Sequence, residues 1–334
     1  MRAAIIDQPG SIRVGEVPDP APGERQVVIK VGACGICGTD LHIADGHFPP
    51  TPYPIVPGHE FAGEIVELGP DVPGGWQVGD RVAVDPSLFC GYCDPCRAGH
   101  GNLCENWGAT GDTVDGAFAE YVAVPSANCY RLPDNLSWQE GALVEPVSCA
   151  VHGVRRIGVE AGEHFLVVGA GTMGLIMQQL LQRAGARVTM VDRNSGRLPR
   201  AKELGAHEIA TDVSELDGER FDASVDCTGA APAMEAAFDA LRRGGRFLVF
   251  GVAPAQARIA LSPFRIYNDE ITVVGSMAVL HSYGAALDLV ASGAIDTKAL
   301  LTDTLPLNKF GDALDLMRSG AGLKVQVLPG GEHA

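Results

Sequence analysis

One stretch of the sequence decides the fold of the second half of the chain: His164-Phe165-Leu166-Val167-Val168-Gly169-Ala170-Gly171-Thr172-Met173-Gly174. Its first five residues are typical of a buried strand, and residues 175–184 behind it have the pattern of a helix. The glycines between them fit G-x-G-x-x-G, which allows a tight turn, close approach of a pyrophosphate and close packing of helix on strand. A helix N-terminus at this point attracts the anion. The stretch therefore predicts a dinucleotide-binding site, with a ligand-free glycine turn as the alternative.

The same alternation of strand and helix continues downstream. Further strands are expected at 187–191, 221–226, 246–250 and 271–274, with a helix at 198–204. Such alternation predicts an α/β fold with a doubly wound parallel sheet. The tail is predicted to hold helices at 282–292 and 308–318 and a strand at 324–328. It is too short for a domain of its own, so we expect it to pack on the first part of the chain.

The end of the next strand carries the signal for the type of cofactor. Asp192 stands 18 residues beyond Gly174, where a carboxylate can accept hydrogen bonds from ribose hydroxyls and would repel a 2′-phosphate. This favours NAD over NADP, although Arg193 and Arg197 nearby keep NADP open. The predicted cofactor-binding residues are Gly169, Gly171, Thr172, Met173, Gly174, Asp192, Arg193, Arg197, Gly251, Val252 and Ser276.

The first 150 residues differ from the rest in composition and in the length of their apolar runs. They are rich in Gly and Pro, and short apolar runs at 27–31, 61–69 and 81–84 are typical of strands. We therefore expect a β-rich, barrel-like domain with long loops. Ser137 and Glu140 fit a capping box, which predicts the start of a helix.

Composition bounds the class of protein. The chain has 334 residues, of which 46% are hydrophobic and 20% charged, enough apolar material for two domains with separate cores. Neither a long uncharged apolar stretch nor a signal-peptide pattern is found, so we expect a cytoplasmic protein with no membrane partner. The net charge of −16 also argues against nucleic acid as a partner. The only basic doublets, Arg155-Arg156 and Arg242-Arg243, are interpreted as solvated helix ends.

The cysteines point to metal. An odd number of them, nine, in a chain without an export signal favours metal or redox chemistry over a disulfide framework. Cys90, Cys93, Cys96 and Cys104 offer four thiolates within a short Gly-containing segment. This spacing predicts a closed, structural zinc site that holds a loop in place, with an iron–sulfur cluster as the competing interpretation.

A third group of candidate ligands is scattered. It comprises Cys37, the neighbours His59 and Glu60, and Glu145. A catalytic zinc needs three protein ligands and one open position, and these are suitable ligand types. Each could equally be an ordinary buried or solvated residue, and spacing alone does not show that they converge.

Together these motifs resemble the zinc-dependent medium-chain dehydrogenase/reductase family, and the resemblance covers essentially the whole chain. It rests on Gly35-x-Cys37-Gly38-Thr39-Asp40-x-His42, on Pro57-Gly58-His59-Glu60, on the four cysteines and on the glycine loop, in this order. Glu145-Pro146 resembles the sorbitol-dehydrogenase-like branch, whereas residues 37–43 also resemble L-threonine dehydrogenases.

The resemblance implies a fold and a set of roles. Residues 1–148 and 279–334 would form a GroES-like β-barrel catalytic domain, and residues 149–278 a Rossmann domain, with the active site between them. Two zinc ions would bind each chain. Cys37 and His59 would bind the catalytic zinc, with Glu60 or Glu145 as the third contact, and Cys90, Cys93, Cys96 and Cys104 would bind the structural zinc. Thr39 would start a proton relay that His42 continues.

The implied activity is hydride transfer between NAD(H) and a small-molecule alcohol or ketone. Zinc would act as a Lewis acid on the substrate oxygen. A polyol or sugar alcohol is the leading substrate class, since Glu145, His42 and Ser276 could contact hydroxyl groups and no phosphate clamp is evident, although Arg265 and Lys298 stay unplaced. L-Threonine, another secondary alcohol, or a non-catalytic NAD- and zinc-binding redox sensor are the alternatives. The resemblance also implies a homodimer or homotetramer.

Overall fold

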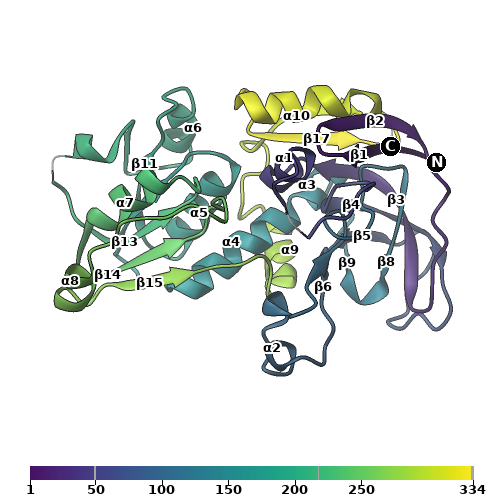
Figure 1. Cartoon of the computed structure of the whole chain (residues 1–334), viewed down its shortest axis with the longest axis horizontal. Coiled ribbons are helices and arrows are strands. Elements are labelled where there is room, and N and C mark those ends of the chain that lie inside the picture. Colours follow the sequence, from purple (N-terminus) through teal and green to yellow (C-terminus); the bar gives the residue numbers. More distant parts are fainter. Residues whose placement is uncertain (49, 217, 332–334) are drawn as a thin grey trace. The chain divides into compact units, whose positions relative to one another are not determined.

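The computed structural model describes residues 1–48, 50–216 and 218–331. Residues 332–334, at the end of the predicted catalytic segment, lie outside the described residues. The chain divides into two compact units (Figure 1). The first, here called the outer unit, joins Met1–Ser148 to Val279–Ala334, and the second, the central unit, is Cys149–Ala278.

The central unit is built on a parallel sheet. Within the described residues its six strands follow the order β12-β11-β10-β13-β14-β15, and every neighbouring pair is parallel. The strands are β10 (His164–Val168), β11 (Arg187–Val191), β12 (Glu208–Ala210), β13 (Phe221–Asp226), β14 (Leu241–Val249) and β15 (Thr272–Gly275). Counted from β10, this order is 3-2-1-4-5-6, the doubly wound arrangement of dinucleotide-binding folds. The predicted parallel sheet is confirmed.

Helices connect these strands. They are α4 (Val144–Ile157), which begins in the outer unit, α5 (Thr172–Arg183), α6 (Leu198–Glu203), α7 (Ala231–Asp239) and α8 (Pro263–Asn268), with a 3₁₀ turn at Val213–Leu216. All five residues of β10 are buried, as a strand covered on both faces requires. Phe221, Phe238 and Phe247 belong to one buried hydrophobic cluster of this unit. β14 begins five residues before the strand predicted at 246–250, because Leu241 already pairs with Phe221. A bulge follows, and regular pairing resumes between Ala223 and Arg246.

The outer unit is mainly β-structure. Its main sheet has the order β16-β17-β3-β4-β5-β9, and β8 pairs with β3 beside this path. The strands are β1 (Arg2–Gln8), β2 (Ser11–Glu16), β3 (Gln26–Gly35), β4 (Glu60–Leu68), β5 (Arg81–Val84), β6 (Ser87–Leu88), β7 (Gly108–Ala109), β8 (Tyr121–Pro125), β9 (Cys129–Arg131), β16 (Leu301–Pro306) and β17 (Lys324–Leu328). The α-helices are α1 (Gly38–Ala44), α2 (Asp94–Arg97), α3 (Trp138–Ala142), α9 (Tyr283–Ala291) and α10 (Phe310–Ser319), and 3₁₀ turns lie at Gly101–Leu103, Ser126–Asn128 and Leu307–Lys309.

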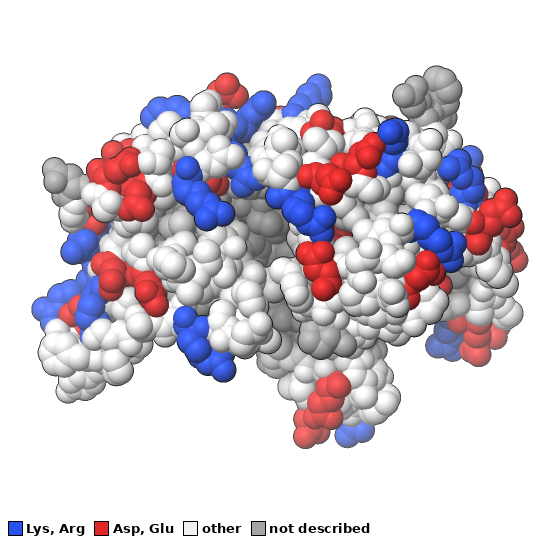
Figure 2. Space-filling view, turned by 45° about the horizontal axis from the view of Figure 1, so that its top comes forward, with Lys and Arg blue, Asp and Glu red and all other residues white. Residues whose placement is uncertain are grey.

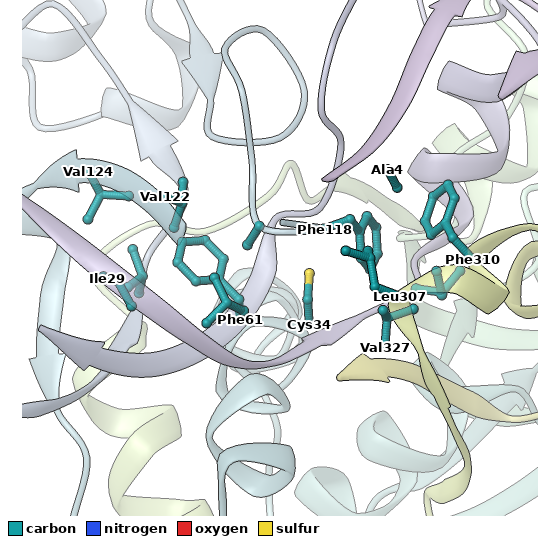
Figure 3. Close-up of a cluster of buried hydrophobic side chains, with 14 of the residues drawn as sticks. Ala4, Ile29, Cys34, Phe61, Phe118, Val122, Val124, Leu307, Phe310 and Val327 are labelled. Atoms are coloured by element: carbon teal, nitrogen blue, oxygen red, sulfur yellow. The ribbon is translucent and has the colours of Figure 1, made fainter. Parts of the chain in front are cut away.

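The C-terminal tail completes the core of the outer unit. β17 pairs antiparallel with β3, so the last strand joins the sheet formed by the first part of the chain, as predicted. Phe310 of α10 packs on Phe118 with ring centroids 4.8 Å apart, and Phe61, Cys34 and Val327 lie in the same buried cluster (Figure 3). The predicted capping box is also present, with the Ser137 hydroxyl accepting from the Glu140 amide.

Charged side chains are interspersed on the surface. On the face shown in Figure 2, Lys and Arg lie among Asp and Glu. Arg155 and Arg156 are in the last turn of α4, as expected for a helix end. Arg242 and Arg243 instead lie in β14 and pair with Asp222 and Asp269, so that interpretation was wrong for the second doublet. Among the described residues, no helix combines the length and apolar character needed to span a membrane.

Candidate functional site

Three of the scattered candidate ligands meet in the outer unit. One ligand atom each from Cys37, His59 and Glu60 lies within 4.8 Å of the other two. Cys37 caps the N-terminus of α1, His59 precedes β4, and Glu60 begins β4. The pairing of β3 with β4 sets Glu60 opposite Gly35, two residues before Cys37. Strand register therefore brings together ligands that are 22 residues apart in sequence.

Local backbone features hold these residues in place. The amide of Cys37 donates to Asp40 Oδ2 at 2.8 Å, which fixes the start of α1. A Cβ atom at Gly35 would lie 2.2 Å from Glu60 Oε2, so the side chain of Glu60 needs glycine opposite it. The sequence pattern around Cys37 thus serves the geometry of the cluster as well as the turn.

A buried lysine faces the cluster, and sequence reasoning missed it. Lys324 of β17 is 2% exposed, forms an ion pair with Glu60 Oε2 and donates to the carbonyl of Ile36 at 2.9 Å. Burial lowers the pKa of Lys324, but Glu60, Cys37 and Glu145 together raise it more, and the net shift is upward. The signal was a polar pattern within an apolar strand, since Lys324 and Gln326 alternate with valines and are both buried.

His59 is held between two acids. Its Nδ1 lies 3.0 Å from Asp112 Oδ1 and 3.9 Å from Asp40 Oδ1. Burial lowers the pKa of His59, but Asp112 and Cys37 raise it well above its ordinary value. Burial raises the pKa of Asp40 to about 7. The sequence motif included Asp40 without a role, and Asp112 was not singled out.

The predicted relay residues lie on α1. Thr39 Oγ1 is 3.7 Å from Cys37 Sγ. His42 follows Thr39 by three residues on the same helix and is half-buried, so the two side chains share one helix face. Glu145, the second residue of α4, is buried but does not belong to the three-residue cluster. Of the two carboxylates considered as third ligand, the structure groups Glu60 with Cys37 and His59.

The cluster fits a catalytic zinc ion. A thiolate, an imidazole and a carboxylate are zinc ligands, and three protein ligands leave the fourth position open. All three side chains belong to the outer unit. His59 and Glu60 are buried, with 6% and 1% of their surface exposed, and Cys37 is half-buried.

The four cysteines form a second cluster. Their sulfur atoms lie within 4.8 Å of one another, and Cys93 Sγ is 3.8 Å from Cys104 Sγ. With Zn–S bonds of about 2.3 Å, tetrahedral geometry separates two sulfurs by about 3.8 Å. The amides of Cys90 and Asn106 also donate to Cys104 Sγ, at 3.3 and 3.2 Å.

The pKa values of two cysteines in this second cluster are shifted in opposite directions. Desolvation raises the pKa of Cys90, but hydrogen bonds from the amides of Tyr92 and Cys93 outweigh it and lower the value to about 6. Desolvation and the neighbouring cysteines raise the pKa of Cys96 to about 12. Four sulfurs within 4.8 Å of one another suit a structural zinc ion, which would keep all four deprotonated.

The glycine loop of the central unit connects β10 to α5. Gly169 has φ +106°, and a Cβ atom at Gly174 would lie 1.7 Å from the carbonyl oxygen of Gly169. Gly171 is the N-cap of α5, and Thr172 and Met173 are its first two residues. The first amides of a twelve-residue helix thus lie at the carboxyl edge of the sheet, beside the point where strand order reverses.

The other predicted cofactor residues follow neighbouring strands. Asp192 comes directly after β11 and accepts hydrogen bonds from the amides of Ala170 at 2.7 Å and Asn194 at 2.8 Å. Arg197 is 3.9 Å from the same carboxylate, whereas Arg193 is exposed. Gly251 and Val252 follow β14, with Val252 exposed, and Ser276 follows β15 with a buried hydroxyl. Carboxyl ends of parallel strands share one edge, so these residues lie along the same edge as the glycine loop.

Comparison with known families identifies the class. Residues 23–134 match the alcohol dehydrogenase GroES-like domain, and residues 172–292 match the zinc-binding dehydrogenase domain. The chain is 35% identical to D-arabinitol dehydrogenase 1 of Uromyces fabae, over 98% of this chain and 97% of that protein. It is also 35% identical to a sorbitol dehydrogenase of Halalkalibacterium halodurans, over 98% and 99% of the two chains. The chain belongs to the zinc-dependent medium-chain dehydrogenase family.

Solved structures agree with this assignment. A zinc-binding dehydrogenase from Sinorhizobium meliloti 1021, bound to NADP, superposes with a TM-score of 0.93 at 35% identity, covering 98% of this chain and 99% of that one. The 2R,3R-butanediol dehydrogenase of Bacillus subtilis superposes with a TM-score of 0.88 at 30% identity, covering 98% and 99%. The protein is therefore an oxidoreductase with a GroES-like domain and a Rossmann domain, and it uses zinc and a nicotinamide cofactor.

Proposed function

We propose that this protein interconverts a secondary alcohol of a polyol or sugar alcohol and the corresponding ketone by hydride transfer with NAD(H). The observation that carries the proposal is the convergence of Cys37, His59 and Glu60 in one buried cluster beside Thr39. The names of the relatives support the substrate class, since they include D-arabinitol, sorbitol and D-altritol 5-dehydrogenases.

The residues in and around the cluster would have separate roles in the reaction. Cys37, His59 and Glu60 hold zinc, which when bound supplies Lewis-acid polarisation of the substrate oxygen. The Thr39 hydroxyl can accept the substrate proton and donate its own, and His42 can carry the proton onward from the same helix face. Glu145, outside the ligand group, could act on a further hydroxyl of the substrate or on water in the site. This assignment explains why a carboxylate stands at position 145.

The four cysteines would hold a second, structural zinc ion. Because Cys90, Cys93, Cys96 and Cys104 occupy all four tetrahedral positions, this ion offers no site for substrate. Its role is to hold the loop between β6 and β7, strands that pair with each other at its base. The protein would therefore bind two zinc ions per chain.

NAD is the proposed cofactor. Asp192, buried after β11, places negative charge where a 2′-phosphate of NADP would have to lie. Arg197 lies 3.9 Å from this carboxylate and partly offsets it. The preference is therefore for NAD with measurable use of NADP, and the ratio of kcat/KM for the two cofactors tests it.

An unphosphorylated substrate is favoured. Arg265, considered earlier as a phosphate ligand, donates to the carbonyl of Leu241 at 2.9 Å and pairs with Asp239 and Asp269, so its guanidinium is used within the central unit. Lys298 is exposed and interacts with Glu140 of α3. The basic group within the outer-unit cluster, Lys324, is neutralised by Glu60.

The test combines metal analysis with a substrate panel. We expect the purified protein to hold two zinc ions per chain and to reduce NAD with polyols in preference to simple secondary alcohols and L-threonine. The variant His59→Ala should keep one zinc and lose activity by at least about a thousandfold, because the catalytic ion is lost. Cys96→Ser is the matched control and should lose the other ion.

Two results would contradict the proposal. Turnover retained in His59→Ala would show that the cluster is not catalytic. Reduction of NAD with L-threonine but not with polyols would replace the substrate class. The cytoplasmic location and the homodimeric or homotetrameric assembly stay predictions, which cell fractionation and light scattering can check.

A further inference from the structure

Asp112 is a buried acid in contact with a candidate zinc ligand. It is 5% exposed, and its Oδ1 lies 3.0 Å from Nδ1 of His59. Its carboxylate is not among the grouped metal-ligand atoms, which come from Cys37, His59 and Glu60. Asp112 therefore faces the ligand rather than the position of the metal.

The turn that carries Asp112 is packed tightly against the loop that carries His59. A Cβ atom at Gly111 would lie 2.3 Å from the carbonyl oxygen of Gly58, and one at Gly116 would lie 2.4 Å from the same atom. Two backbone hydrogen bonds also join these segments. The Gly116 amide donates to the Val56 carbonyl at 2.7 Å, and the Ala117 amide donates to the Gly58 carbonyl at 2.9 Å. Close backbone contact through glycines therefore fixes the backbone that carries Asp112 against the loop that carries His59.

The alternative partner of His59 is already engaged. Asp40 Oδ1 is farther away, at 3.9 Å, and Asp40 Oδ2 accepts from the amide of Cys37. Neither His59 Nδ1 nor Asp112 Oδ1 makes a hydrogen bond among the described residues, and the two atoms lie 3.0 Å apart. At 3.0 Å against 3.9 Å, Asp112 is the acid within hydrogen-bond distance of the imidazole.

We propose that Asp112 is a positioning residue that accepts the Nδ1 proton of His59 and so presents Nε2 to the zinc ion. This inference rests on the proposed function. A carboxylate on the far nitrogen of a zinc-bound imidazole fixes its tautomer and ring orientation and makes the ligating nitrogen more basic. Removal of such a partner costs about 10- to 100-fold in metal affinity.

The experiment measures retention of metal by the intact zinc-loaded protein. Wild type, Asp112→Ala, Asp112→Asn and Asp115→Ala are challenged with a chelator, and the release of each zinc ion is followed. Asp115 is the matched control, because it lies in the same turn and its Oδ1 accepts from the Val56 amide at 2.9 Å, away from His59. The visible spectrum of the cobalt-substituted proteins reports the geometry of the catalytic metal independently of turnover.

In the expected result, Asp112→Ala holds one of its two metal ions about 10- to 100-fold less tightly and its cobalt spectrum changes. Asp112→Asn, whose amide oxygen can still accept from Nδ1, should fall between Asp112→Ala and wild type. Asp115→Ala should lower thermal stability but keep both metal affinities. If Asp112→Ala does not fold, the comparison of Asp112→Asn with Asp115→Ala decides.

Equal metal affinity in wild type and the Asp112 variants would overturn the positioning role, and so would an equal loss in Asp115→Ala. In both cases polyol oxidation by wild type would leave the proposed function standing. A wild-type protein that binds no metal at the Cys37 cluster would instead overturn both.

Discussion

At the scale of single residues, the ion pair between Lys324 and Glu60 sets the charge of the site. Both side chains are almost fully buried, and the Lys324 ammonium also holds the carbonyl of Ile36. A buried carboxylate without a partner is costly, and Lys324 supplies the opposite charge beside Glu60. The pair thus balances charge next to the candidate metal cluster.

Replacement of Lys324 tests this view. We expect Lys324→Met to lower the free energy of unfolding by about 3 kcal/mol in the metal-free protein, because it leaves the carboxylate of Glu60 uncompensated. The double variant Lys324→Met/Glu60→Gln should recover a large part of the loss. Urea denaturation with and without zinc measures both effects, and an equal loss in single and double variants would contradict the pairing.

At the scale of elements, the glycine loop combines two different requirements. Gly174 packs against backbone, because its missing Cβ would lie 1.7 Å from the Gly169 carbonyl. Gly171 is not crowded, since the nearest atom to a Cβ there is Arg197 Nη1 at 3.7 Å. The junction of β10 and α5 therefore requires glycine at position 174. At position 171 the fold has room for a methyl group, so glycine there would serve a bound ligand.

The two glycines should respond differently to alanine. Gly174→Ala is expected to destabilise the protein by about 1–3 kcal/mol, since backbone must move to admit the methyl group. Gly171→Ala should leave stability nearly unchanged and weaken NAD binding about tenfold or more, because the methyl group obstructs the pyrophosphate. Thermal unfolding and cofactor titration separate the two effects. Equal stability losses, or unchanged NAD affinity in Gly171→Ala, would contradict this division.

At the scale of the whole molecule, each unit has its own core and its own buried polar groups. In the central unit, the ring of His164 is almost fully buried, hydrogen-bonds with Thr189 Oγ1 at 2.9 Å and contacts Phe221. Burial, with the nearby charges of Arg187 and His207, lowers the pKa of His164 from 6.5 to about 4. This group links the stability of the protein to pH.

The sign of the pH effect follows from the two pKa values. As pH falls, His164 takes up a proton at about pH 6.5 in the unfolded chain but only near pH 4 in the folded one. Its contribution to stability is therefore complete above about pH 6.5 and is lost towards pH 4, by up to about 3 kcal/mol. His164→Gln should flatten this part of the pH profile of chemical denaturation. His207→Gln removes only one of the lesser causes of the shift and should flatten the profile much less, and an unchanged profile in His164→Gln would contradict the assignment.

Much of the fold follows from local signals. The strand ranges 221–226 and 324–328, the capping box at Ser137 and the glycine loop at 169–174 were all predicted from patterns a few residues long. Burial period, turn chemistry and capping act between near neighbours, so sequence alone carries them. The four-cysteine cluster belongs here too, because all its sulfurs come from one short segment.

The candidate metal cluster in the outer unit could be predicted only in part. Cys37, His59 and Glu60 were named as candidates, but sequence did not choose between Glu60 and Glu145, and it missed Lys324 and Asp112. The pairing of β3 with β4 and with β17, together with the glycine contacts of the 111–116 turn, brings these side chains to one place.

The sequence by itself determined the class of each half of this protein, its zinc and nucleotide motifs, and the identity of the candidate ligands. The tertiary structure alone decided which acid lies in one cluster with Cys37 and His59, which acid lies within hydrogen-bond distance of His59, and which cation pairs with Glu60. The physical reason is the sequence separation over which each effect acts. Propensity and periodicity act within a single element, whereas strands from distant positions in the chain set the environment of a buried charge.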